Sequence, residues 1–303
     1  RDIQSVERLL DAARQNAQPL DGQGEYDGVL HGEMPDNSGK SKENSFTPFS
    51  SLGEQLKAIY SFRKGGVRDE RLEKINAAAE SAGRSGSEVR LLAATKMNGP
   101  EAVQEAIRAG VDICAENRVQ EFLSKNAVNA YAPCCVHFIG HLQKNKVKYL
   151  VGAVELIHSV DSPELMDAIS RRAVSLGIVQ DVLLEVNIGG EASKSGVSPD
   201  GLEPLLAHAA LCPGLRVKGL MTIPPAVSAG EENRWYFRQM YELFVDIRRK
   251  TYDNVTMAEL SMGMSGDYEE AVRCGATIVR LGTALFGPRN YDLQEAPPYG
   301  TIG

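Results

Sequence analysis

A regular alternation of short apolar runs with helical stretches begins after Val67, and it constrains the fold more than any other feature. Eight apolar runs are separated by seven stretches that can each form a helix, and a further helical stretch precedes the first run. Such alternation is typical of a parallel sheet with helical crossovers. The apolar runs are Val89–Thr95, Val111–Cys114, Val136–Ile139, Leu156–Val160, Val182–Val186, Val217–Met221, Ala258–Leu260 and Ile278–Leu281.

Two folds share this alternation, a closed (β/α)8 barrel of the TIM type and an open doubly wound sheet. Eight units within about 225 residues fit the barrel. A doubly wound dinucleotide-binding sheet carries G-x-G-x-x-G after its first strand, and this motif does not follow Val89–Thr95. We therefore predict a barrel over residues 67–291. Its helices are expected at Asp69–Ala82, Pro100–Ala109, Val119–Ala127, Lys144–Val151, Pro163–Leu176, Pro199–Leu211, Gly230–Lys250 and Tyr268–Cys274.

The two ends of the chain differ from this regular part. Apolar positions within residues 2–16 have the spacing of one amphipathic helix. Residues 18–51 are polar and rich in Gly, Ser, Asp and Asn, which is typical of a flexible linker, and residues 52–62 can form a second short helix. We predict that residues 1–66 are a helical and disordered extension and that residues 292–303 are a C-terminal tail.

The charge and the cysteines narrow the class of protein. The formal net charge of −7 argues against nucleic acid or an anionic membrane as a main partner. No apolar run is long enough to span a bilayer. The five cysteines include no C-x-x-C pair, so we expect reduced thiols in a cytoplasmic protein.

Lys96 is the most informative polar residue, because it directly follows the first apolar run. In a (β/α)8 barrel, functional side chains gather at the carboxyl ends of the strands. Partial desolvation there lowers the pKa of a lysine and frees its amine to attack an aldehyde. The alternative is a lysine that extends from the barrel rim into solvent.

The last two strands indicate a phosphate site. Gly263 and Ser265 follow the seventh run, and Gly282 and Thr283 follow the eighth. Small residues let backbone N–H groups approach a phosphate, and hydroxyls add donors. The alternative is a pair of tight turns that require glycine.

Arg280 is predicted to point toward the barrel axis, with Val279 and Leu281 facing the helices. A buried guanidinium needs a partner. That partner is either a carboxylate, Asp267 or Glu116, or the ring nitrogen of a bound cofactor.

The histidines His137, His141 and His158 lack the spacing of a metal site. We expect ordinary core or rim histidines and no metal.

Eight segments of the chain resemble the pyridoxal phosphate homeostasis protein family. The match keeps the order of the family and covers about three quarters of the chain, whereas residues 1–66 have no counterpart. The matching segments are Ala94–Lys96, Glu116–Glu121, His137–Lys146, His158–Asp161, Gly219–Ile223, Leu260–Asp267, Gly275–Thr277 and Val279–Gly287.

The resemblance implies a barrel like the N-terminal domain of alanine racemase, holding pyridoxal 5'-phosphate (PLP). It implies a Schiff base on Lys96 and a position for Arg280 beside the pyridine nitrogen. It further implies phosphate contacts from Ser265, Gly282 and Thr283, and it puts Asn117 near the ring. We include Met221 and Ser261 in the same cofactor site.

Three hypotheses about function follow. The first is a non-enzymatic protein of PLP homeostasis, which passes PLP to PLP-dependent apoenzymes and is a monomer or weak dimer. The second is a PLP enzyme such as an amino-acid racemase. Racemases of this fold need a further β-rich domain that supplies a tyrosine, and only twelve residues follow Tyr291. The third treats residues 1–66 as a docking module of a tethered adaptor. We expect the first.

Overall fold

The structure, a computed structural model, describes residues 66–111, 113–225 and 230–287. The chain divides into two units, Arg1–Phe46 and Thr47–Gly303, and all described residues belong to the second. The predicted N-terminal extension, apart from Gly66, and the predicted C-terminal tail lie outside the described residues.

Eight parallel strands form a closed barrel in chain order. Strand β8 pairs with β1, so Leu92 lies beside Ile113 on one side and beside Arg280 on the other. The barrel prediction is confirmed, and the open doubly wound sheet is wrong because closure leaves no edge strand. The strands are β1 (Arg90–Ala94), β2 (Ile113–Glu116), β3 (Cys135–Phe138), β4 (Leu156–Val160), β5 (Gln180–Glu185), β6 (Leu215–Met221), β7 (Val255–Ser261) and β8 (Ile278–Leu281).

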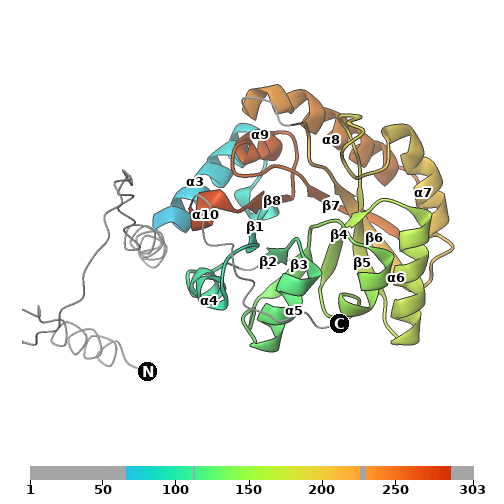
Figure 1. The fold of residues 1–303 in the computed structure, drawn as a ribbon. Coiled ribbons are helices and arrows are strands. Elements are labelled where there is room, and N and C mark those ends of the chain that lie inside the picture. Colours follow the sequence, from blue (N-terminus) through green and yellow to red (C-terminus); the bar gives the residue numbers. More distant parts are fainter. Residues whose placement is uncertain (1–65, 112, 226–229, 288–303) are drawn as a thin grey trace, which may run out of the picture. The chain divides into compact units, whose positions relative to one another are not determined.

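Helices surround the strands in chain order (Figure 1). Pro100 and Pro163 each open a helix, where the missing N–H of proline costs no hydrogen bond. The helices are α3 (Gly66–Ser81), α4 (Pro100–Arg108), α5 (Val119–Ala127), α6 (Pro163–Ser175), α7 (Leu202–Ala209), α8 (Arg234–Arg248), α9 (Tyr268–Arg273) and α10 (Thr283–Phe286). Short 3-10 turns are η1 (Gly86–Glu88), η2 (Lys144–Tyr149), η3 (Pro199–Gly201) and η4 (Gly230–Asn233).

The apolar core has two layers, because successive strand residues face opposite sides. On β8, Val279 and Leu281 belong to the layer between strands and helices, as predicted, while Ile278 belongs to the layer inside the barrel. The inner layer consists of Leu92, Ile113, Ala115, Leu156, Leu183, Met221 and Ile278. Arg280 shares the inward parity of Ile278, so the barrel closes around a buried guanidinium.

Several local predictions differ from the structure, among them the start of β6 at Leu215 rather than Val217 and the span of β7, Val255–Ser261 rather than Ala258–Leu260. Strand β2 begins at Ile113 rather than Val111, because Gly110 takes a φ of +90° and the Val111 N–H closes α4 on the Ala106 carbonyl. Residues 144–149 form a 3-10 turn rather than an α-helix, and Val147 is its one buried residue, too little to support an apolar helix face. The short helix α10 was not expected.

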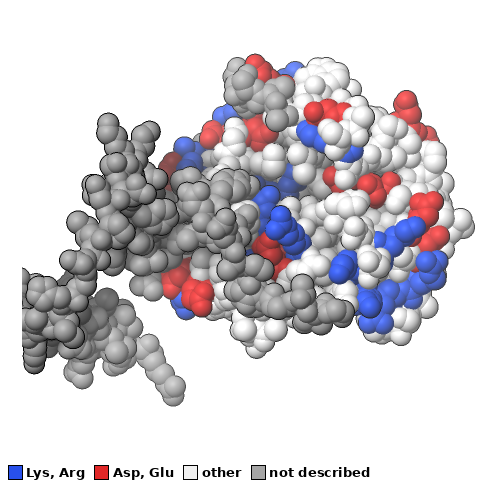
Figure 2. Space-filling model, in the orientation of Figure 1, with Lys and Arg blue, Asp and Glu red and all other residues white. Residues whose placement is uncertain are grey.

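Acidic and basic side chains are interspersed over the visible face of the described region, with a basic group at the lower right of the view (Figure 2). The acidic net charge therefore leaves room for local positive sites. Among the described residues, no helix is both long and apolar enough to cross a membrane.

Candidate functional site

The predicted site residues gather at the carboxyl ends of the strands. Lys96 follows β1, Asn117 follows β2, and Ser261 ends β7 beside Met221 of β6. Gly282 follows β8 and packs closely on β1, since a Cβ added at Gly282 would lie 3.7 Å from the carbonyl oxygen of Ala94. Because all eight strands run in parallel, these residues meet at one rim of the barrel.

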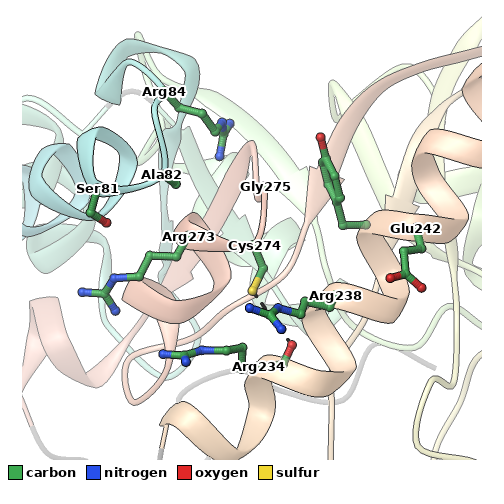
Figure 3. Close-up of a pocket in the computed structure, with 10 residues that line it drawn as sticks. Ser81, Ala82, Arg84, Arg234, Arg238, Glu242, Arg273, Cys274 and Gly275 are labelled. Carbon is green, nitrogen blue, oxygen red and sulfur yellow. Dashed lines mark hydrogen bonds between the residues drawn. The ribbon is translucent and has the colours of Figure 1, made fainter.

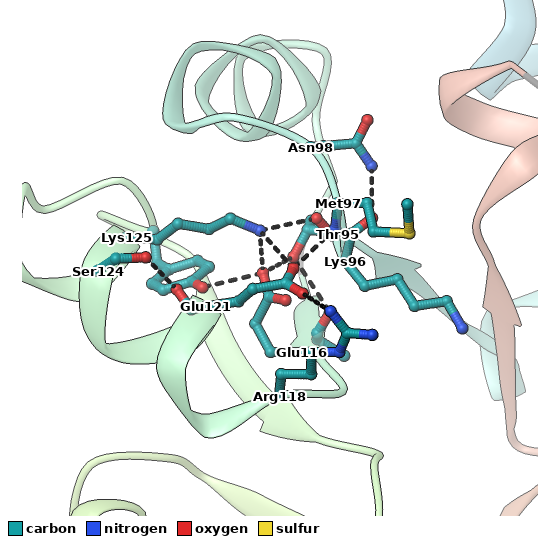
Figure 4. A network of polar contacts seen from close by, with 11 residues as sticks. Thr95, Lys96, Met97, Asn98, Glu116, Arg118, Glu121, Ser124 and Lys125 are labelled. Carbon is teal, nitrogen blue, oxygen red and sulfur yellow. Dashed lines mark hydrogen bonds and ion pairs between the residues drawn. The ribbon is translucent and has the colours of Figure 1, made fainter. Parts of the chain in front are cut away.

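Lys96 is directed away from the polar network behind its strand (Figure 4). It is partly exposed, and its own carbonyl accepts a hydrogen bond from the Asn98 amide at 3.1 Å. Its neighbour Thr95 is fully buried. The backbone that carries the amine is therefore fixed while the side chain projects from the opposite side.

Glu116 and Lys125 form a buried ion pair behind Lys96 (Figure 4). Lys125 Nζ lies 2.6 Å from Glu116 Oε1 and donates to the Thr95 carbonyl at 2.8 Å. The same carboxylate oxygen accepts from Thr95 Oγ1 at 2.6 Å and from the Tyr131 hydroxyl at 3.0 Å. Burial raises the pKa of Glu116, while Lys125 and Thr95 oppose that rise.

Met97, on the other side of Lys96, is also held. Its N–H donates to Glu121 Oε2 at 2.7 Å, and its φ of +63° is costly for a residue that is not glycine. Glu121 Oε2 lies 3.7 Å from Lys125 Nζ. Carboxylates that share Lys125 thus hold both neighbours of Lys96, which the sequence did not predict. The available signal was the i,i+4 spacing of Glu121 and Lys125.

Arg280 is 4 % exposed and donates to two neutral acceptors. Nη1 lies 2.8 Å from Ser261 Oγ, and Nη2 lies 2.8 Å from the Thr222 carbonyl. Burial lowers the pKa of Arg280 to about 10, so the guanidinium stays charged at neutral pH.

Neither predicted carboxylate forms a hydrogen bond with Arg280 among the described contacts. Glu116 is engaged by Lys125, and Asp267 accepts from the Asn233 amide at 2.7 Å and the Met264 N–H at 2.6 Å. Asp267 and Glu185 act on Arg280 only through their charge. The carboxylate-partner interpretation of Arg280 was therefore wrong.

Two backbone N–H groups converge on one oxygen at the end of β8. Ser265 Oγ accepts from the Gly282 N–H at 3.3 Å and from the Ala284 N–H at 3.2 Å. Thr283 lies between these two residues and is exposed. Donors arranged in this way suit an anionic oxygen.

Asn117 has a buried side-chain oxygen with no hydrogen-bond partner among the described residues. Its backbone is crowded, because a Cβ added at Gly140 would lie 2.0 Å from the Asn117 carbonyl oxygen. A buried acceptor without a partner is costly, so this atom fits a donor supplied by a bound group.

Glu185 is a titratable group that the sequence did not predict. It ends β5, shares the inward parity of Leu183 and is 7 % exposed. Burial raises its pKa to about 7, the charge of Asp161 acts in the same direction, and Arg280 opposes both. The signal in the sequence was an acidic residue at an inward position of an apolar run.

The raised pKa predicts a pH dependence of folding. A carboxyl group with a folded pKa of about 7 and an ordinary value of 4.5 binds its proton more tightly when folded. Its stabilisation is complete below pH 4.5 and is lost as the pH rises through about 7, a change of about 3 kcal/mol. Glu185→Gln should remove this pH-dependent part of the free energy of unfolding. Urea unfolding of both proteins at pH 5 and pH 8, without added ligand, measures the difference. Equal pH dependence in both proteins would contradict the assignment.

Two of the three predicted histidines lie in the core, and the third lies at the surface. His137 and His158 are fully buried, with His137 Nδ1 3.0 Å from His158 Nε2, and His141 is exposed. Elsewhere, His208 Nε2 lies 2.8 Å from Asp167 Oδ1, and Cys212 Sγ lies 3.8 Å from that oxygen. In the described part of the chain, this is the single group of three side chains close enough to share a metal ion.

A second basic region lies outside the barrel, in a cavity of about 520 Å³ among α3, α8 and α9 (Figure 3). Three of the four arginines that line it already have partners in the fold. Arg234 and Arg273 pair with Glu270, and Arg84 donates to the carbonyls of Val272 and Ala276. We therefore assign this region to helix packing rather than to the site at the barrel rim.

Comparison with known proteins decides the family. The family model described as alanine racemase, N-terminal domain, matches residues 70–290. The pyridoxal phosphate homeostasis protein of Aquifex aeolicus is 49 % identical over 220 residues, which are 73 % of this chain and 96 % of that protein. The chain belongs to the pyridoxal phosphate homeostasis protein family. The resemblance predicted from the sequence motifs is thereby confirmed.

Solved structures agree with this family. The crystal structure of an unknown protein from Bifidobacterium adolescentis has a TM-score of 0.67 and 38 % identity, covering 76 % of this chain and 96 % of the other. PipY of Synechococcus elongatus, solved with PLP bound, has a TM-score of 0.62 and 32 % identity, covering 70 % of this chain and 100 % of PipY. The predicted alanine racemase-like barrel therefore has solved counterparts.

Proposed function

We propose that this chain binds PLP at the barrel rim and acts in PLP homeostasis and delivery, with a Schiff base on Lys96. One observation carries the proposal. The N–H donors gathered at Ser265 include that of Gly282, which lies against Ala94, two residues before Lys96. An amine and an anion-binding group thus lie on adjacent strands, as a phosphorylated aldehyde requires.

The relatives support the cofactor. The Aquifex aeolicus protein is named for PLP homeostasis, and PipY has been solved with PLP bound. The residues of this chain also fit the group, since the rim offers an amine, a buried guanidinium, paired N–H donors and an unpartnered amide oxygen.

Each site residue has a role in this proposal. Lys96 holds the cofactor covalently, and Ser265, Gly282 and Thr283 bind its phosphate. Arg280 lies beside the pyridine nitrogen, and Asn117, Met221 and Ser261 line the ring. When bound, PLP supplies an electron sink for chemistry at an amino-acid α-carbon.

Arg280 argues for a carrier rather than an efficient enzyme. A guanidinium only donates hydrogen bonds. It therefore favours an unprotonated pyridine nitrogen, which weakens the electron sink.

One observation favours the alternative, a racemase-like enzyme. Glu185 has a pKa of about 7. It lies on β5, which is opposite β1 in a closed barrel of eight strands. A carboxyl group of that pKa can serve as an acid or base.

Exchange of the amino-acid α-proton distinguishes carrier from enzyme. With PLP-loaded protein in deuterated water, we expect alanine, serine and threonine to exchange far more slowly than about 1 per second. Proton NMR of the α-position measures the rate. Exchange at or above that rate, abolished by Glu185→Gln, would replace the carrier proposal with the enzyme.

The recipients of PLP in this proposal are PLP-dependent apoenzymes, and the protein acts as a monomer or weak dimer. A cytoplasmic location fits the five cysteines, none of which forms a disulfide within the described part of the chain. Residues 67–291 form the cofactor-binding unit.

A further inference from the structure

A buried chain of polar side chains runs through the barrel from Arg280 toward the opposite end. Ser261 Oγ lies 2.8 Å from Arg280 Nη1 and 3.1 Å from His158 Nδ1. His158 Nε2 lies 3.0 Å from His137 Nδ1, and His137 Nε2 lies 3.7 Å from Glu155 Oε1. Ser261 and both histidines are fully buried, whereas Glu155, just before β4, is half exposed. The hydrogen bonds therefore run from Arg280 to His137, and Glu155 lies beyond them near the amino ends of the strands.

Arg280 fixes the direction of these hydrogen bonds. A guanidinium has only donors, so Ser261 Oγ accepts from Arg280 and has its own proton to give. His158 Nδ1 is the other group within hydrogen-bonding distance of Ser261 Oγ among the described contacts, so it accepts that proton. A neutral His158 then carries its proton on Nε2 and donates it to His137 Nδ1.

The charge at the far end favours the same direction, although His137 Nε2 lies 3.7 Å from Glu155 Oε1 and has no hydrogen-bond partner among the described residues. His137, accepting at Nδ1, carries its proton on Nε2, which faces the carboxylate of Glu155. The reverse direction would turn an imidazole lone pair toward that carboxylate and leave the Ser261 proton without an acceptor. Both ends therefore favour one arrangement.

Both histidines are uncharged at neutral pH. Burial is the main cause that lowers the pKa of His137 and of His158, and Arg280 and Arg90 add repulsion at His158. Arg90 itself pairs with Glu259 at 2.7 Å. A neutral imidazole has one hydrogen-bond donor and one acceptor. Each histidine can therefore accept one hydrogen bond and donate one.

We propose that His158 and His137, in their Nε2–H forms, are positioning residues that hold the Ser261 hydroxyl and thereby the guanidinium of Arg280 in the orientation that receives the cofactor ring. With Nη1 held by Ser261 and Nη2 by Thr222, the guanidinium plane is set before any ligand arrives. The orienting role for PLP rests on the proposed function, whereas the proton positions do not.

The proton positions can be read directly by NMR. The protein has five histidines. Two-bond couplings between ring nitrogens and ring C–H protons distinguish Nε2–H, Nδ1–H and charged rings. In the full-length protein without added PLP, His137 and His158 should both show Nε2–H at pH 8, and the pKa of each should lie below the ordinary histidine value. An Nδ1–H or charged ring at either position at that pH overturns the proposal, whether or not PLP binds.

Two variants of His158 test the effect on PLP. In His158→Asn the side-chain oxygen can replace Nδ1 as the acceptor for Ser261, whereas His158→Leu offers no acceptor. We expect the dissociation constant for PLP to rise about tenfold in His158→Leu, equivalent to about 1.4 kcal/mol, and to change less than about threefold in His158→Asn. Thermal unfolding checks that both variants fold.

The outcomes separate this inference from the proposed function. Equal losses of affinity in the two folded variants, or no loss in His158→Leu, would show that the histidines act only through packing. If the wild type does not bind PLP, the proposed function fails, and the NMR result alone decides the hydrogen-bond direction. If neither variant folds, the NMR result on the wild type again decides.

Discussion

Replacing Lys96 with alanine abolishes the borohydride-reducible adduct with PLP at this position and weakens PLP binding roughly a hundredfold or more, about 2.8 kcal/mol. The reason is that the variant lacks the amine that closes the covalent bond, while Arg280 and the N–H donors at Ser265 remain. The wild-type protein with bound PLP should be yellow, and reduction with borohydride should remove the absorbance that causes this colour. Peptide mass spectrometry of the reduced wild type locates the modified lysine.

Lys218→Ala provides the control for this experiment. Lys218 lies within β6, below the rim, and its replacement should leave the adduct intact. The assignment to Lys96 would be wrong if the reduced wild type carried its PLP on another lysine, such as Lys194 in the loop after β5. Circular dichroism should show an intact fold, since the Lys96 side chain points away from the buried network (Figure 4).

Replacing Lys125 with methionine should destabilise the barrel by about 3–5 kcal/mol, because it leaves the fully buried Glu116 without its cation. For a domain of this size the melting temperature should fall by roughly 6–20 °C. The loss should grow with pH. Burial raises the pKa of Glu116, so the protonated carboxyl stabilises the variant at low pH and this stabilisation is lost as Glu116 ionises.

Two further variants give this prediction its controls. Adding Glu116→Gln to Lys125→Met removes the buried charge and should recover part of the loss. Lys74→Met breaks the pair with Glu70, where both side chains are about half exposed, and should change the melting temperature little. Equal melting temperatures for Lys125→Met and wild type would show that the buried pair contributes nothing.

Lys125→Met should also disturb the site around Lys96, because Thr95 and Met97 flank Lys96 and both are held by the carboxylates that Lys125 bridges.

Sequence reasoning could place Lys96 at the end of a strand, since strand ends follow from the apolar period. It could not pair Glu116 with Lys125, because a residue at the end of a strand and one on the next helix meet only after the helix packs on the barrel. Sequence reasoning also misplaced the start of β2. After the turn at Gly110, the Val111 N–H bonds to the preceding helix rather than to a neighbouring strand.

The sequence by itself determined the order of strands and helices, the closed barrel and the rim on which Lys96, Arg280 and Gly282 lie. These follow from local periods, and β4 and β8 begin and end where the apolar runs do. The tertiary structure alone decided which polar groups meet. Arg280 donates to Ser261 and the Thr222 carbonyl rather than to a carboxylate, and Ser261 reaches His158 across 103 residues of chain. Register and closure set such contacts, because they bring inward-facing residues of different strands to the same depth inside the barrel, and no local pattern records that depth.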